Sequence, residues 1–269
     1  MNYNHRVASG RATLATYVVG RGSPVVFLHS NVCDSRMWNA QLDAVSASHK
    51  AVAYDRRGFG ETTAEREDHS ALADLMAVLD ATTNGEPAIL VSCSLGGRIA
   101  LNAALRHPWR VRALFLIAPN VTGAPGPTYS PEIERLLAQS KGAEAARDID
   151  RVNATKARLW LDGPLAPEGR VAGPARDLLL DMNGIALRSP PVGSDVDVPP
   201  IYHRLSEVGA PSFVVWGDLD FPYLQERCRH VAATVPNVSG REMKGTAHLP
   251  SLDQPEEITA LLATFIETQ

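Results

Sequence analysis

The sequence predicts an α/β protein with a mostly parallel sheet and helices on both of its faces. Short runs of apolar and β-branched residues alternate with segments in which leucines recur at helical spacing. Several of the short runs are apolar almost throughout, as expected for strands that are covered on both faces. Regular alternation of strands and helices is typical of parallel sheets, because each crossover between parallel strands needs a helix or a long connection.

Seven segments have the composition of strands, and two have clear helical periodicity. The turn GRGS separates the first two strands, and leucines or similar residues recur through 72–79 and 258–265. The expected strands are 12–19, 24–30, 50–55, 87–94, 111–119, 212–218 and 238–245.

The stretch from residue 121 to residue 205 interrupts this rhythm. It contains helical patches such as PEIERLLAQ, Pro/Gly-rich connections, and no convincing strand. So long a connection is either a disordered insertion or a helical subdomain, and its leucines, Trp160 and Met182 favour the latter. We therefore expect residues 1–120 and 206–269 to form the core domain and residues 121–205 to form a helical cap.

Composition excludes several classes of function. The 269 residues carry 26 Lys and Arg against 30 Asp and Glu, a net charge of −4, so neither nucleic acid nor a membrane is an expected partner. The three cysteines lack metal-ligand spacing, and we expect free thiols and no metal. No signal-peptide core and no apolar run near about 18 residues occurs, which predicts a cytoplasmic protein, either monomer or homodimer.

The stretch VSCSLGGRIA, residues 91–100, places a serine between an apolar strand and the start of a helix. A nucleophile on a sharp strand-to-helix turn has the pattern Gly-x-Ser-x-Gly, with small residues where strand and helix nearly touch. Ser94 is therefore the candidate nucleophile, with Gly96 and Gly97 behind it and Ser92 at the usual first glycine. The alternative is an ordinary strand end followed by a Gly-Gly helix start.

Two later segments supply the partners that a serine nucleophile needs. The strand in VVWGDLD ends in Asp218 and Asp220, and GTAHLPSLD places His248 in a loop before the last helix. A serine hydroxyl needs a base to remove its proton, and the base needs a carboxylate to orient it. The order serine, acid, histidine at three strand ends matches that need. Alternatively, either aspartate caps the next helix and His248 is a surface residue.

With these motifs, the chain resembles the α/β-hydrolase superfamily over nearly its whole length. LHSNVCDSRMW resembles the family's His-Gly loop, YDRRGFGET its Asp-x-Arg-Gly-x-Gly turn, and WGDLD its Gly-x-x-Asp motif. The resemblance makes Ser94, Asp220 and His248 the catalytic residues, and places the oxyanion hole at the backbone N–H groups of Asn31 and Leu95. It also implies structural roles for three further residues: His29, Asp55 and Arg57.

Two features resemble 3-oxoadipate enol-lactonases and related small esterases. One is Ser30, at a position where the loop usually has glycine, and the other is the stretch RLWLDGP in the cap. This resemblance implies hydrolysis of a small ester or lactone without a cofactor, with Trp160 of the cap in the substrate pocket. Dehalogenases and epoxide hydrolases of this fold instead carry an aspartate at the sharp strand-to-helix turn (the nucleophile elbow), where this chain has Ser94. A carbon–carbon bond hydrolase, and a ligand receptor or signalling protein that keeps the same three residues, remain as alternatives.

Overall fold

The computed structural model describes residues 4–269 and confirms the α/β architecture. Its sheet has the order β1-β2-β4-β3-β6-β7-β8-β9, and β5 pairs with β2. The strands are β1 (His5–Ser9), β2 (Ala12–Val19), β3 (Pro24–Leu28), β4 (Lys50–Tyr54), β5 (Thr63–Ala64), β6 (Ala88–Cys93), β7 (Val111–Ile117), β8 (Ser212–Gly217) and β9 (Val238–Met243).

The sheet is parallel from β4 through β9, and only β1, β2 and β5 at one end make antiparallel pairs. Strands β3 and β6 lie in its middle and are fully buried along their whole lengths. Buried apolar strands with no polar alternation require cover on both faces. Because these strands run parallel, the carboxyl ends of β3, β6 and β8 lie at the same edge of the sheet. The candidate residues follow these strand ends.

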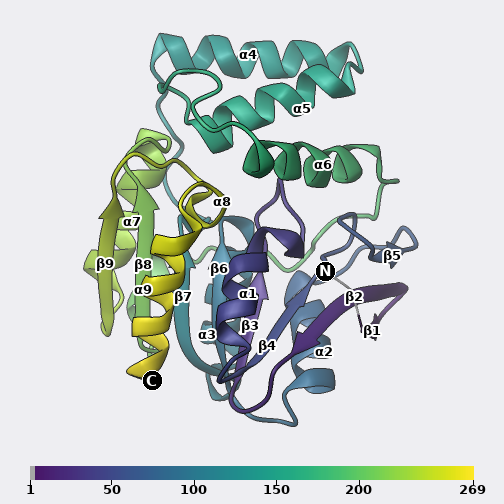
Figure 1. Cartoon of the computed structure of the whole chain (residues 1–269), viewed down its shortest axis with the longest axis vertical. Coiled ribbons are helices and arrows are strands. Elements are labelled where there is room, and N and C mark those ends of the chain that lie inside the picture. Colours follow the sequence, from purple (N-terminus) through teal and green to yellow (C-terminus); the bar gives the residue numbers. More distant parts are fainter. Residues whose placement is uncertain (1–3) are drawn as a thin grey trace.

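Helices cover both faces of the sheet, as Figure 1 shows. On one face, α1 (Asn39–Val45) packs against α9 (Pro255–Glu267). The opposite face carries α2 (Ala71–Thr82), α3 (Leu95–Arg106) and α7 (Pro222–Thr234). Both helical periodicities expected from the sequence are confirmed, since they fall in α2 and α9.

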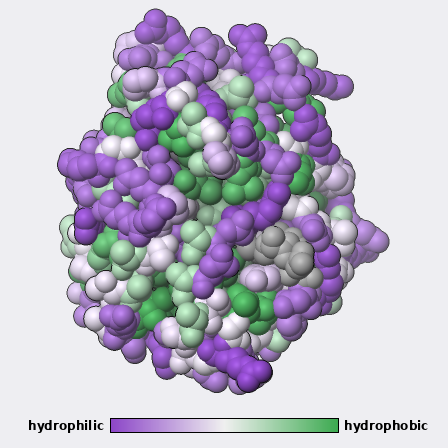
Figure 2. Space-filling model, viewed as in Figure 1, coloured by the Kyte–Doolittle hydropathy of each residue, from purple (hydrophilic) through white to green (hydrophobic). Residues whose placement is uncertain are grey.

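The connection between β7 and β8 contains most of the remaining helices, which lie over the carboxyl edge of the sheet (Figure 1). They are α4 (Pro131–Ala145), α5 (Ile149–Ala157), the π-helical turn η3 (Arg158–Asp162), α6 (Pro174–Arg188) and the 3₁₀ turn η4 (Tyr202–Glu207). We call residues 121–205 the cap, and its status as a separate domain remains a prediction. Figure 2, viewed from the same side as Figure 1, shows hydrophobic residues gathered just below the uppermost helices.

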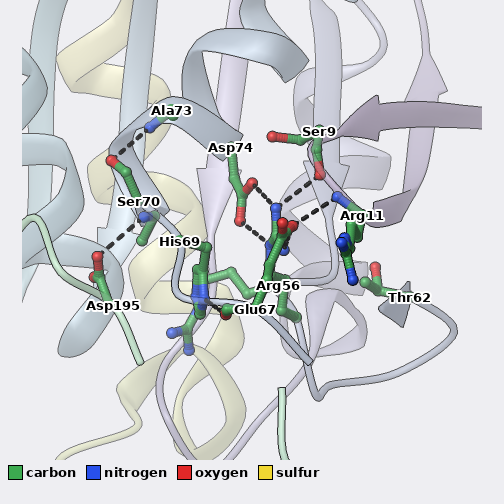
Figure 3. Close-up of polar contacts among 12 residues, drawn as sticks. Ser9, Arg11, Arg56, Thr62, Glu67, His69, Ser70, Ala73, Asp74 and Asp195 are labelled. Carbon is green, nitrogen blue, oxygen red and sulfur yellow. Dashed lines mark hydrogen bonds and ion pairs between the residues drawn. The ribbon is translucent and has the colours of Figure 1, made fainter. Parts of the chain in front are cut away.

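The last part of the cap, residues 192–197, is fastened to the core beside α2 and α3. Its backbone bonds to residues 67–69, and an isolated parallel bridge joins His69 to Asp195. Asp195 pairs with Arg98 of α3 at 2.5 Å, and it lies next to Ser70 at the start of α2 (Figure 3). The cap therefore contacts the core at this end through both main chain and charged side chains.

Candidate active site

Ser94 lies on a sharp turn between β6 and α3. Its backbone has φ 54° and ψ −113°, a left-handed conformation that residues other than glycine rarely adopt. A side chain at Gly96 would overlap the carbonyl oxygen of Leu28, and one at Gly97 would come within 2.6 Å of Cβ of Pro119. The two glycines are therefore explained by the close approach of α3 to the neighbouring strand ends.

Ser92 occupies the position of the usual first elbow glycine without disturbing the strand. The residue is fully buried in β6, and its hydroxyl donates a hydrogen bond of 3.5 Å to the carbonyl oxygen of Phe115 on β7. A small side chain with a partner for its hydroxyl can be buried at little cost. The departure from the glycine pattern is thus accommodated by the adjacent strand.

Asp220 and His248 form a buried pair. Nδ1 of His248 lies 2.7 Å from Oδ2 of Asp220, and the side chains are 3% and 0% exposed. The other carboxylate oxygen of Asp220 accepts the backbone N–H of Phe221 at 2.7 Å. The His248 backbone N–H donates to the carbonyl oxygen of Trp160, which fixes the loop against the cap. A carboxylate on Nδ1 leaves Nε2 of the imidazole as the nitrogen available to act on a hydroxyl.

Asp218 makes a different set of contacts. One of its carboxylate oxygens accepts the backbone N–H of Gly245 at 2.8 Å, and the other lies 3.6 Å from Nζ of Lys244. Both contacts belong to the turn that follows β9. The structure therefore places Asp220 against His248 and Asp218 on the adjacent turn, the arrangement that the Gly-x-x-Asp resemblance implied.

A cavity of about 80 Å³ brings Ser94 and His248 together. No hydrogen bond joins the Ser94 hydroxyl to His248 in the described chain, and such bonds often tighten only when substrate binds. The cavity is lined by Ser30, Asn31, Val32, Ser94, Lys156, Trp160 and His248. The Trp160 ring lies 4.7 Å from the His248 ring, so the expected pocket residue borders the base directly.

The two expected oxyanion donors follow β3 and β6, which are neighbouring strands of the sheet. Leu95 is the first residue of α3, and Asn31 follows β3. Within residues 4–269, neither backbone N–H donates a hydrogen bond to another group of the chain. Asn31 lines the cavity that contains Ser94, whereas Leu95 lines a separate cavity of about 180 Å³. Unpartnered N–H groups beside a nucleophile can stabilise an oxyanion that forms there.

The three residues expected to be structural are engaged in the core. Asp55 accepts hydrogen bonds from Ser35 and Glu61, and Arg57 binds Asp74, Glu67 and the carbonyl oxygen of Ser9. Three of the Arg57 partners, Ser9, Glu67 and Asp74, lie close together in Figure 3. His29 is fully buried, and burial together with the nearby Arg56 charge holds its pKa well below the ordinary value. His29 therefore stays neutral at physiological pH.

The cysteines are unpaired and buried, and none is placed as a competing nucleophile. Cys93 directly precedes Ser94, but burial raises the pKa of its thiol well above the ordinary value. Burial likewise raises the pKa of Cys33 to about 12. The thiolate is the reactive form of cysteine, so both remain poor nucleophiles at neutral pH.

Lys156 is a cavity residue that the sequence analysis did not identify. It belongs to α5, contributes its side chain to the cavity with Ser94, and lies 3.6 Å from Oε1 of Glu144. Lys156 precedes Trp160 by four residues, so the two share one face of the continuous α5–η3 helical segment. That spacing from the expected pocket residue is the sequence signal that could have found it.

A mostly parallel sheet with a serine on the elbow after β6, and an aspartate–histidine pair at the same sheet edge, defines an α/β protein of the hydrolase fold. The Alpha/beta hydrolase family model matches residues 25–261. The chain belongs to this family.

Proteins similar to this chain carry names that indicate different activities. A carboxylesterase, YbfK of Bacillus subtilis (strain 168), is 24% identical over 93% of this chain and 84% of its own. An epoxide hydrolase of Caballeronia sordidicola is also 24% identical, over 97% of this chain and 93% of its own. The structure of the enol-lactonase from Burkholderia xenovorans LB400 superposes with a TM-score of 0.73 at 18% identity, covering 97% of this chain and 99% of that one.

Residues 4–269 lack two further features. None of the helices there combines the length and apolar character needed to cross a bilayer. No group of three or more His, Cys, Asp and Glu side chains in this range is arranged to hold a metal ion.

Proposed function

We propose that this protein is a serine hydrolase that cleaves a small carboxylic ester or lactone through an acyl-enzyme intermediate. The observation that carries the proposal is the buried Asp220–His248 pair, whose histidine borders the same cavity as Ser94. A nucleophile, a base and an orienting carboxylate are the groups that acyl transfer requires. YbfK, a family relative named as a carboxylesterase, supports an ester as the substrate.

In this mechanism Ser94 attacks the ester carbonyl carbon while Nε2 of His248 takes the hydroxyl proton. Asp220 holds the Nδ1–H tautomer and stabilises the imidazolium that results. Backbone N–H groups of Asn31 and Leu95 bind the oxyanion of the tetrahedral intermediate. His248 then protonates the leaving alkoxide. A water molecule, deprotonated by the same histidine, hydrolyses the acyl-serine and restores the free enzyme.

The size of the site favours a short acyl group. The cavity beside Ser94 measures about 80 Å³, and it is bordered by the Trp160 ring and the Lys156 side chain. Epoxide opening in this fold uses an aspartate at the elbow, and this chain has Ser94 there. We therefore favour a small ester or lactone over the epoxide that the Caballeronia sordidicola relative's name indicates.

The proposal is tested with p-nitrophenyl esters of increasing acyl length and a panel of simple lactones. We expect the highest kcat/KM for acetate or propionate esters, and a serine-directed fluorophosphonate should add once, at Ser94. Ser92→Ala is a matched control, because that serine is two residues away but bonds only within the sheet. Full activity of Ser94→Ala, or labelling elsewhere, would overturn the assignment. Slow turnover with ligand-dependent partner binding would favour the receptor alternative.

A further inference from the structure

The peptide between Ser30 and Asn31 carries hydrogen bonds on its carbonyl side and none on its N–H side. The carbonyl oxygen of Ser30 accepts from Nδ1 of His29 at 2.7 Å, from Nη2 of Arg56 at 2.9 Å and, at the longer distance of 3.5 Å, from the backbone N–H of Cys33. Within the described residues, the N–H of Asn31, on the other end of the same peptide, has no partner in the chain. The two ends of this one peptide unit therefore face very different surroundings.

The His29 ring is held in one tautomer by its neighbours. The backbone N–H of Arg56 donates to Nε2 of His29 at 3.0 Å, so Nε2 is the acceptor nitrogen of a neutral ring. Nδ1 then carries the proton and donates it to the Ser30 carbonyl oxygen. His29 thus supplies a neutral hydrogen bond, and among the described residues Arg56 supplies the only charged donor on that oxygen.

The guanidinium of Arg56 is buried without a carboxylate partner. The residue is 7% exposed, and no ion pair to Arg56 occurs anywhere in the described chain. Its guanidinium carbon lies 4.7 Å from the centre of the Phe59 ring, which holds the side chain in place. By contrast Arg57, the next residue, is neutralised by Asp74 and Glu67. A buried, unneutralised charge is costly, and it acts strongly on the groups that it touches.

We propose that Arg56 is a positioning residue that orients and polarises the Asn31 N–H as an oxyanion donor. In a trans peptide the N–H points opposite to the carbonyl, and the described chain has no cis peptide bonds. By binding the Ser30 carbonyl, Arg56 turns the Asn31 N–H to the opposite side of the peptide. Asn31 and Ser30 both line the cavity that holds Ser94. The positive charge also withdraws electron density through the peptide and strengthens its N–H as a donor.

This inference rests on the proposed hydrolase function, and its expected size follows from the oxyanion donor. Removing one such donor outright lowers kcat by about 10²–10³-fold. Arg56 acts through the donor and does not replace it, so we expect Arg56→Met to lower kcat by about 30-fold. That factor corresponds to about 2 kcal/mol at the transition state. KM should stay within about twofold, because Arg56 is not part of the lining of the cavity that holds Ser94.

Steady-state hydrolysis of p-nitrophenyl acetate by Arg56→Met, Arg56→Lys and native protein tests the inference. Lysine keeps a positive charge near the carbonyl, so we expect Arg56→Lys to retain kcat within about fivefold. Affinity for an aryl trifluoromethyl ketone, whose Ser94 adduct carries an oxyanion, should fall by about the same factor as kcat. A purely structural role would not make these two quantities fall together while KM is unchanged.

Arg57→Met is the matched control, since it removes an equally buried charge from the adjacent residue. We expect it to lower Tm through the loss of the Asp74 and Glu67 pairs, with kcat of the folded protein within about threefold. Any of three results would overturn the inference. These are equal losses of kcat in both methionine variants, a kcat for Arg56→Met within threefold of native, and a raised KM with kcat unchanged. If Arg56→Met does not fold, a kcat of Arg56→Gln equal to that of Arg56→Lys overturns it, and a lower one supports it. Activity retained in Ser94→Ala would instead refute the proposed hydrolase.

Discussion

Replacing Asp220 by asparagine should nearly abolish turnover while the matched change at Asp218 leaves it almost intact. Asparagine has the shape of aspartate but no charge, and its amide can force the wrong tautomer on His248. The structure sets the size of the loss, because Nδ1 of His248 lies 2.7 Å from Oδ2 of Asp220 in a buried pair. With charge centres about 4 Å apart and an effective dielectric constant of about 20, the imidazolium–carboxylate attraction is about 4 kcal/mol.

A loss of about 4 kcal/mol at the transition state corresponds to about 10³-fold in rate. The tautomer defect adds to this, and the equivalent change in a serine protease costs about 10⁴-fold. We therefore expect kcat of Asp220→Asn to fall by 10³–10⁴-fold. Asp218 instead accepts a hydrogen bond from Gly245 in a partly exposed turn, so Asp218→Asn should keep kcat within about threefold.

The assay is steady-state hydrolysis of p-nitrophenyl acetate, with circular dichroism melts to confirm that both variants fold. Hydroxide-dependent background hydrolysis is subtracted with Ser94→Ala protein at the same concentration. If Asp218→Asn shows the larger loss, the orienting role belongs to Asp218. Equal small losses in both variants would mean that His248 does not act as the base, and the mechanism would have to be withdrawn.

Three further outcomes are expected. Trp160→Ala should change the ranking of acyl chain lengths more than it lowers acetate hydrolysis, and loss of all activity in folded protein would contradict that division of roles. Native Cys93 should resist iodoacetamide at pH 8 by intact-mass analysis, whereas modification without unfolding would contradict its burial and raised pKa. The free energy of unfolding in urea should fall as pH drops below about 6.5, by about 1.4 kcal/mol per unit, because the unfolded chain protonates His29 and the folded chain does not. His29→Gln should show a shallower slope, and an unchanged slope would assign the effect to other groups.

Most of the sheet could be predicted because its central strands β3, β6 and β7 are nearly continuous apolar runs. The expected strand at 12–19 coincides with β2, and the six others begin or end within two residues of the observed strands. Strand β1, HRVAS, was missed because only one of its five residues is buried. The two-residue β5 was missed because its pairing with β2 is too short to leave a pattern. Edge strands half exposed to solvent lack the apolar signal that identifies buried ones.

The candidate site could be located from sequence because Ser94, Asp220 and His248 each follow a strand that ends at the same sheet edge. Arg56 and Lys156 could not be predicted in the same way. Arg56 reaches Ser30 only because β3 and β4 are parallel neighbours, a pairing that the sequence does not specify. Lys156 faces the cavity only through the packing of α5 over the sheet. Arg56 acquires its role from tertiary arrangement alone, whereas the only local signal for Lys156 is its four-residue spacing from Trp160.

The left-handed backbone of Ser94 has a consequence for how this protein can be altered. A non-glycine residue in that conformation costs about 1–3 kcal/mol. Glycine would relieve this strain at a cost of about 0.5–1 kcal/mol, through the greater freedom of the unfolded chain. Ser94→Gly protein should therefore be inactive and yet melt at the same or a higher temperature than native protein. A screen of variants for thermal stability alone would tend to retain such changes, so stability and turnover in this chain must be selected together.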